Sequence, residues 1–264
     1  MAISNVQNQY SIPRGRVYFD IFDSAGNKTG ERELGNSPGF SIEIATEKAE
    51  HYSSETGLRQ KDASVVLQVD RTATLQIDNM SLENVALFFS RTTSTISQAL
   101  DAAASEELTV QVDRSYQLGV TESMPVGVRN VASVVVTDGA DVSPTTYTLG
   151  DDYELDASMG RIRIVPGGAI ASDDTLEVSY EVPAATWLEA KTGASSEING
   201  AFRVVSDNAT GTQRDFYMPR CSLQPSGSLP IIAEGTDWAV MEFMLDVLKP
   251  SNAEALYIDG RPAP

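Results

Sequence analysis

The segment from Pro38 to Phe89 most constrains what this chain can fold into, because its hydrophobic period changes from that of a strand to that of a helix. Apolar and polar residues alternate from Phe40 to Ile44 and again from Val65 to Ile77, a spacing that gives a strand one buried face and one solvated face. The alternation stops at Asn79. The sequence therefore predicts two strands, the second one long, followed by a short helix that lies on the sheet.

Ser81 predicts the start of that helix. Serine is a favoured N-cap residue, and Asn84 stands three positions later, where a capping box would have Glu or Gln. Apolar side chains then recur along one side of the helix, and we expect that side to face the sheet. The residues of this candidate flanking helix are Leu82, Val85, Leu87, Phe88 and Phe89.

A polar and charged run separates the two strands. It extends over 18 residues, from Thr46 to Ala63, which is longer than most connections inside compact domains. Two interpretations stay open: a plain solvated loop, or an arm that reaches a neighbouring subunit. The candidate contact residues, all within 47–62, are Glu47, Lys48, Glu50, His51, Tyr52, Glu55, Arg59, Lys61 and Asp62.

The chain is acidic, and its charge is concentrated in the middle. It has 264 residues and a formal net charge of −18, and residues 101–190 alone hold 16 acidic and four basic side chains. A surface of this sign repels the phosphate backbone, because nucleic-acid binding depends on cationic neutralisation and counterion release. We therefore expect no specific binding of DNA or RNA, and solubility alone would account for the charge.

Cysteine usage and hydropathy bear on the compartment. A single cysteine, Cys221, cannot form an internal disulfide, so the fold does not depend on an oxidising environment. The first ten residues lack the basic and apolar regions of a secretory signal. No run approaches the roughly 20 apolar residues of a membrane-spanning helix. We expect a chain that is made and assembled in the cytoplasm, without a membrane partner.

The chain divides into a core that is interrupted once. Short strands separated by turn residues fill the segment 119–185, which predicts a small, acidic, antiparallel β subdomain that is inserted into the core and faces solvent. The expected divisions are an N-terminal arm at 1–15, the core at 16–118 and 186–249, the inserted subdomain at 119–185 and a C-terminal tail at 250–264.

The core contains further strand patterns. The pattern at 239–248 is apolar on both faces, so this strand lies either inside the core or at a subunit contact. Residues 92–105 have apolar side chains at helical spacing, which predicts a weak helix or an ordered linker. A turn is expected at 224–229. The other core strands are expected at 16–23, 108–113, 201–205 and 215–223.

The chain is poor in catalytic groups. It has one histidine, His51, with no second histidine or nearby cysteine to complete a zinc site, and no Gly-x-Ser-x-Gly sequence to present a serine nucleophile. No glycine-rich phosphate loop precedes a helix. We expect no enzymatic activity and no cofactor.

Clustered carboxylates are the remaining candidates for acid–base or metal chemistry. The doublets 106–107, 151–152 and 173–174 fall at turns, and adjacent carboxylates in a strand point to opposite faces, so we interpret them as solvated turns. Asp151, Asp152, Glu154 and Asp156 lack the glycine and the terminal glutamate of an EF-hand. We therefore expect no metal site.

The order of these elements resembles the major tail tube proteins of long, non-contractile bacteriophage tails. The resemblance lies in the strand, loop, strand and helix between Pro38 and Phe89, and in the two later segments that begin Phe202-Arg-Val-Val-Ser-Asp-Asn-Ala-Thr-Gly and Phe216-Tyr-Met-Pro-Arg-Cys-Ser-Leu-Gln-Pro-Ser-Gly. It covers about residues 10–118 and 187–249.

The resemblance implies a mainly β fold: an antiparallel β-sandwich with a short flanking helix, to which the strand patterns at 119–185 add the inserted β subdomain. In this family the subunits form stacked hexameric rings whose strands join into an inner barrel, which removes free sheet edges. The resemblance places residues 1–15 and 47–62 at neighbouring rings, and the barrel wall at 38–46, 64–78, 201–206 and 214–223.

The same resemblance implies the function and the partners. The chain would be a tail-tube subunit of the virion that binds itself and other tail components, namely tape measure, tail terminator and tail-tip proteins. Genome DNA would pass through the lumen without specific binding, helped by like-charge repulsion. The alternative is a tail-tip or adhesin-type module that recognises a host-surface sugar or protein through the middle β subdomain.

Overall fold

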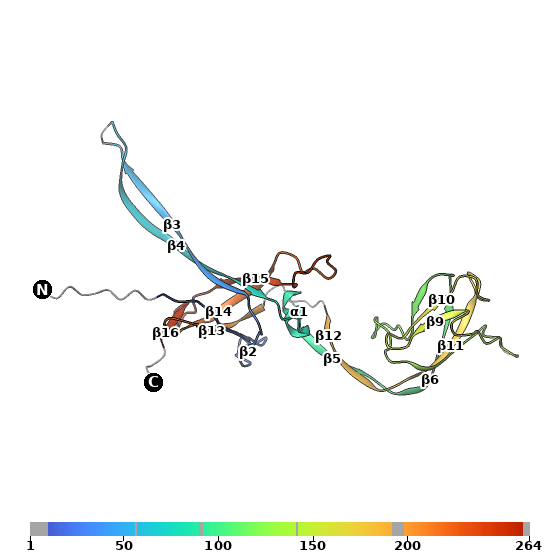
Figure 1. Ribbon diagram of the computed structural model, residues 1–264. Coiled ribbons are helices and arrows are strands. Elements are labelled where there is room, and N and C mark those ends of the chain that lie inside the picture. Colours follow the sequence, from blue (N-terminus) through green and yellow to red (C-terminus); the bar gives the residue numbers. More distant parts are fainter. Residues whose placement is uncertain (1–9, 56, 90–91, 141, 192–197, 261–264) are drawn as a thin grey trace. The chain divides into compact units, whose positions relative to one another are not determined.

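The computed structural model describes residues 10–55, 57–89, 92–140, 142–191 and 198–260. They form two compact units: Met1–Ser94 with Ala190–Pro264, and the continuous segment Thr95–Glu189 (Figure 1). Apart from one seven-residue helix, every regular element in the described part of the chain is a strand, so the prediction of a mainly β fold is confirmed. No helix of this part is long and apolar enough to span a membrane.

The first unit is built on one antiparallel sheet of eight strands. Its order is β2-β1-β13-β14-β15-β4-β3, and β16 pairs with the other end of β14. Most neighbouring strands in this sheet follow one another in the sequence, and only the pairings of β1 with β13 and of β15 with β4 join distant segments. The strands are β1 (Gly15–Ile21), β2 (Arg32–Glu33), β3 (Gly39–Ser53), β4 (Gln60–Ile77), β13 (Ile198–Ser206), β14 (Arg214–Ser226), β15 (Met241–Val247) and β16 (Tyr257–Gly260).

Alternation along the central strands builds the core of this unit. In β15, Met241, Phe243 and Leu245 are buried whereas Met244 is exposed. The strand therefore gives one face to the core, and its other face is exposed in the single chain. The neighbouring end of β4 buries Leu75 on the same core.

The flanking helix α1 (Leu82–Phe88) begins where the sequence predicts. The Ser81 side chain accepts a hydrogen bond from the backbone N–H of Asn84 at 3.3 Å, which is the N-cap interaction. Phe88 packs edge-on against Phe243 of β15, with ring centroids 5.8 Å apart. Phe89 does not join the buried side as expected, because it is the C-cap residue and its side chain is exposed.

The prediction of a long loop between the first two strands is wrong. β3 continues to Ser53 and β4 begins at Gln60, so only residues 54–59 connect them. The register slips at Glu47/Lys48 and at His51/Tyr52, where β-bulges lie. The sequence here lacks strand alternation because neither face of this part of the hairpin is buried.

The second unit contains two three-stranded antiparallel sheets that share one core, in which Val136, Ile162 and Val178 are fully buried. Strand β11 alternates buried and exposed residues along its whole length. The first sheet has the order β7 (Ser115–Gln117), β10 (Arg161–Ile164) and β9 (Tyr153–Asp156). The second has the order β6 (Asp101–Thr109), β11 (Thr175–Val182) and β8 (Ala132–Thr137).

The boundaries of the second unit differ from those expected for the inserted subdomain. The unit begins at Thr95 and ends at Glu189, because β6 pairs along β11 and so belongs to this core. The helix or linker expected at 92–105 is instead strand: β5 (Thr92–Gln98), which pairs with β12 (Ala185–Lys191), and the start of β6. Tertiary pairing here overrides helical spacing of the apolar residues.

Smaller differences lie at the ends of the first unit. β14 covers the first three residues of the turn expected at 224–229 and ends at Ser226, and the expected C-terminal tail contains β16. In the expected N-terminal arm, Ile12 forms a bridge with Thr210 and Gly15 already belongs to β1. Residues 1–9 of that arm and 261–264 of the tail lie outside the described residues.

Candidate interaction surfaces

The distal part of the β3–β4 hairpin, residues 44–71, extends beyond the sheet and is called the arm here (Figure 1). β15 pairs with β4 only from Thr72 to Ile77, so past Thr72 the hairpin has two strands and no further neighbour among the described residues. At a rise of roughly 3.3 Å per residue the arm reaches about 30 Å. Both of its edges present unpaired backbone N–H and C=O groups.

The apolar face of the core continues onto the arm. Ile42 pairs with Ala73 in the core, and two residues further out Ile44 stands on the same face, followed by Val69 opposite Thr46. Ile44 is 57% exposed and Val69 is 41% exposed. A two-stranded hairpin is marginally stable alone, and a row of exposed aliphatic side chains typically marks a contact surface.

Seven of the nine candidate contact residues lie on the strands of the arm, and Glu55 and Arg59 lie in its connection. Several hold the two strands together rather than standing free. His51 Nδ1 lies 2.6 Å from Asp62 Oδ1, and Lys61 pairs with Glu50, which together with the Tyr52 hydroxyl keeps the pKa of the Glu50 carboxyl below its usual value.

These contacts order the tip of the arm without adding much stability. The groups in the pairs are exposed, and exposed ion pairs contribute little because solvent screens them. The guanidinium of Arg59 lies over the Tyr52 ring, 5.5 Å from its centroid. The charged residues thus specify the shape of the arm tip, while the aliphatic residues nearer its base remain uncovered.

The opposite face of β3, β4 and β15 is acidic. Glu43 and Asp246 both pair with Thr72, and Glu242 pairs with Gln76, whose side-chain amide donates to the Glu242 carboxylate at 2.9 Å. No lysine or arginine shares this face along residues 39–47, 68–76 and 242–246. This acidic face comprises the carboxylates of Glu43, Glu47, Asp70, Glu242 and Asp246.

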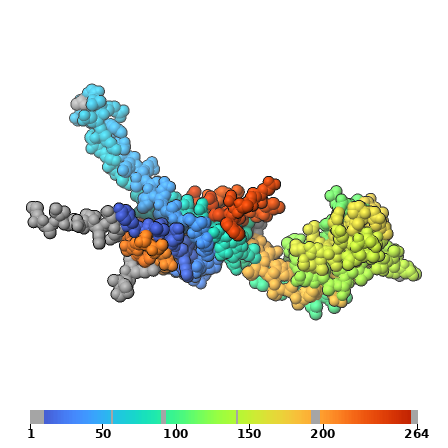
Figure 2. Space-filling model, viewed as in Figure 1, coloured from blue at the N-terminus to red at the C-terminus, as the bar shows by residue number. Residues whose placement is uncertain are grey.

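The connection between β14 and β15, residues 227–240, exposes three large apolar side chains and is called the apolar loop here. Ile231 is 76% exposed, Ile232 is 95% exposed and Trp238 is 89% exposed. The loop forms part of the red-orange surface in Figure 2. The sequence offered a signal that the strand analysis did not use, namely a Pro-Ile-Ile run and a tryptophan within a stretch rich in turn residues.

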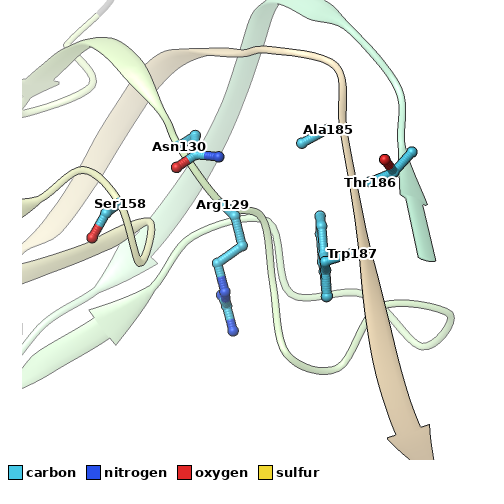
Figure 3. A pocket seen from close by; sticks show the side chains of 6 residues that line it. All are labelled: Arg129, Asn130, Ser158, Ala185, Thr186 and Trp187. Atoms are coloured by element: carbon cyan, nitrogen blue, oxygen red, sulfur yellow. The ribbon is translucent and has the colours of Figure 1, made fainter. Parts of the chain in front are cut away.

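The second unit carries a pocket of about 290 Å³ (Figure 3). Arg129 is fixed in it, because its guanidinium donates to the backbone carbonyls of Val126 and Met159 at 2.8 and 3.1 Å. Trp187 presents its indole ring to the same space. The residues that line the pocket are Arg129, Asn130, Ser158, Ala185, Thr186 and Trp187.

Residues 10–255 match the family model described as protein of unknown function UCP028589. The chain belongs to the UCP028589 family. The matched residues include the arm, the acidic face, the apolar loop and the pocket, so each is a feature of a UCP028589 member. A search of curated proteins gave no match to this chain.

In this UCP028589 member one carboxylate of each doublet accepts a backbone hydrogen bond, and the doublet 106–107 lies in strand β6 rather than at a turn as expected, with Glu106 accepting from the N–H of Gly119. Asp152 accepts hydrogen bonds from the N–H groups of Ala169 and Thr148, which lower the pKa of its carboxyl, and Asp174 accepts from the N–H of Ala171. Within the described ranges no three histidine, cysteine or acidic side chains come together as a metal site would require. These carboxylates therefore have structural partners that explain their positions.

Proposed function

We propose that this chain is a structural subunit that assembles with copies of itself into a tube, as in the tails of long, non-contractile bacteriophages. The observation that carries the proposal is the arm. It has two unpaired edges and an uncovered apolar row at Ile44 and Val69, and a second copy of the chain would satisfy both. A lone subunit leaves these groups in water, whereas an assembly buries them.

The acidic face supports a role as a conduit for DNA. It belongs to the sheet that we propose as the tube wall, formed by β3, β4, β13 and β14 together with β15. The carboxylates that this face carries on β3, β4 and β15, such as Glu43 and Glu242, would repel a passing phosphate backbone and prevent adhesion. We place this face toward the lumen.

The remaining details of the proposal come from the resemblance to tail tube proteins. The subunits would close the first unit as a β-sandwich and assemble into hexameric rings that stack. Tape measure, tail terminator and tail-tip proteins would be the other partners, and the virion tail would be the location. The second unit would lie outside the wall.

Shortening the arm tests the proposal. Residues 46–69 are removed and an Asn-Gly turn joins Ala45 to Asp70, which pair in the native register. We expect the intact chain to form rings or tubes in negative-stain electron microscopy and the shortened chain to stay monomeric in analytical ultracentrifugation. Because the arm lies outside the core, the shortened chain should keep its β circular-dichroism spectrum.

Two results would contradict the proposal. An intact chain that remains monomeric at high concentration rejects self-assembly altogether. Tubes that form equally well without residues 46–69 reject the role of the arm. A control that substitutes Leu58 at the tip by Ser leaves both edges and the row at Ile44 in place, and is expected to assemble.

The pocket favours a second candidate function, a tail-tip or adhesin-type module that binds a host-surface sugar. The Trp187 ring offers an apolar platform for the C–H face of a sugar ring, beside the polar side chains of Asn130 and Thr186. On a glycan array, the intact chain should bind and Trp187→Ala should not. Leu149→Ser, which changes an exposed apolar residue of the same unit, is the control.

A further inference from the structure

The arm and the apolar loop lie at opposite ends of the same sheet. Met241, which follows the loop, pairs with Ile77, whereas Asp246, at the other end of β15, pairs with Thr72, where the arm begins. The arm therefore leaves the sheet in the direction away from the loop. Two copies in the same orientation, one behind the other, would bring the loop of one toward the arm of the next.

The two surfaces are complementary in polarity. The arm pairs Ile44 with Arg71 and Lys48 with Val66, so its apolar row is flanked by cations. The apolar loop carries two acidic residues, Glu234 and Asp237, near its isoleucines and tryptophan in the sequence. Both acidic residues are exposed.

Neither surface is covered by the residues that the structure describes. Ile232 and Trp238 are more exposed than any other isoleucine or tryptophan among the described residues, at 95% and 89%. Tryptophan side chains at the centre of an interface typically contribute much of its binding free energy. The loop thus has the exposed aromatic side chain that is typical of the centre of an interface. The arm of the same chain extends away from the loop.

We propose that the apolar loop of one copy docks on the aliphatic row of the arm of the next copy. Trp238 and Ile232 cover the row that contains Ile44 and Val69, and Glu234 and Asp237 face the cations beside it. The contact is heterologous, since it joins two different surfaces, and its repetition generates a ring or an open stack. It rests on the proposed self-assembly and names its interface.

Two substitutions test the anchor. Trp238→Ser should raise the concentration needed for assembly by about tenfold or more, because an aromatic anchor is lost. Val142→Ser is the matched control, since Val142 is 84% exposed but lies in the second unit, and it should leave assembly unchanged. Circular dichroism verifies that both variants fold, which is expected because both side chains lie on the surface.

Charge exchange tests the register of the contact. Glu234→Lys with Asp237→Lys should weaken assembly, and so should Lys48→Glu with Arg71→Glu on the arm. An equimolar mixture of the two variants should co-assemble better than either alone. In an alternating assembly the basic loop of one variant meets the acidic arm of the other, and the acidic loop of the second meets the basic arm of the first, whereas each variant alone pairs like charges.

The outcomes separate this inference from the proposed function. Tubes that form normally from Trp238→Ser, or a mixture no better than its components, overturn the docking of the loop and leave self-assembly intact. An intact chain that does not assemble at any concentration overturns self-assembly, and the docking with it. A selective loss with Trp238→Ser and recovery in the mixture establish the contact.

Discussion

The rings of Phe19 and Phe202 stack across strands β1 and β13, with centroids 4.2 Å apart and planes inclined by 18°. Both side chains are almost fully buried, and the contact joins segments far apart in the sequence. We expect Phe202→Ala to lower the free energy of unfolding of the first unit by about 3–5 kcal/mol, because a cavity remains. Urea denaturation measures the loss, and Phe202→Leu should cost less.

Gly200 makes room for this stack. A Cβ atom at that position would lie 2.3 Å from Cε2 of Phe19 and 2.4 Å from the carbonyl oxygen of Asp20. Gly200→Ala should therefore destabilise the first unit by roughly 1–3 kcal/mol, as overpacking does. Gly57→Ala is the control, since nothing lies within 4 Å of its Cβ position, and unchanged thermal stability of Gly200→Ala would contradict the packing described.

Asn84 connects the start of helix α1 to the sheet. Its buried amide donates to the carbonyls of Leu34 and Asn79, at 2.8 and 3.0 Å, and accepts from Arg32 Nη1 at 2.8 Å. Asn84→Ala should lower the free energy of unfolding, measured by chemical denaturation, by about 1–3 kcal/mol or more, because it removes the hydrogen bonds that these buried partners make with the amide. Asn36→Ala, at an exposed hydrogen bond, should cost much less, and equal losses would refute the explanation.

Burial raises the pKa of the Cys221 thiol to about 12. In the unfolded chain the thiol ionises near pH 8.5, so stability from this group is complete below that pH and falls as pH rises toward 12, by up to about 1.4 kcal/mol per pH unit. The stability difference between the native chain and Cys221→Ala should narrow over this window. A difference independent of pH, or rapid alkylation of the folded thiol, would argue against its burial.

The second unit has its own core, with Ile162 and Val178 fully buried, and it is continuous in sequence. We therefore expect the segment Thr95–Glu189, produced alone, to unfold cooperatively on heating. The intact chain should show a transition at a closely similar temperature. A non-cooperative melt of the isolated segment would show that its core depends on the first unit.

The sequence predicted the strands that have one buried and one solvated face, because only these alternate. The strand that begins at Val65 was recognised from its inner half, where Leu75 and Ile77 are buried. Its extension toward Gln60 was not, because solvent surrounds that part on both faces and no period is imposed. The segment that the sequence predicted to be a loop is therefore mostly strand in the structure.

Long-range strand pairing explains why the prediction for residues 92–105 was wrong. Ile96, Leu100 and Ala104 mimic a helical side, yet Leu100 is 71% exposed and the segment pairs as strand. The sequence predicted the residues of the arm as a contact surface, and that role stays a prediction. The apolar loop was passed over, because exposure of Trp238 is a property of the fold that residue type does not reveal.

Strands β5 and β12 pair with each other, so the chain departs toward the second unit and comes back along adjacent paths. An insertion site of this kind accepts an unrelated domain with neighbouring ends in place of the residues between Gln98 and Ala185. If the chain assembles with copies of itself as we propose, every copy would then display the new domain at a regular spacing. The pairing of β5 with β12 would in that case let an assembly carry foreign domains in an ordered array.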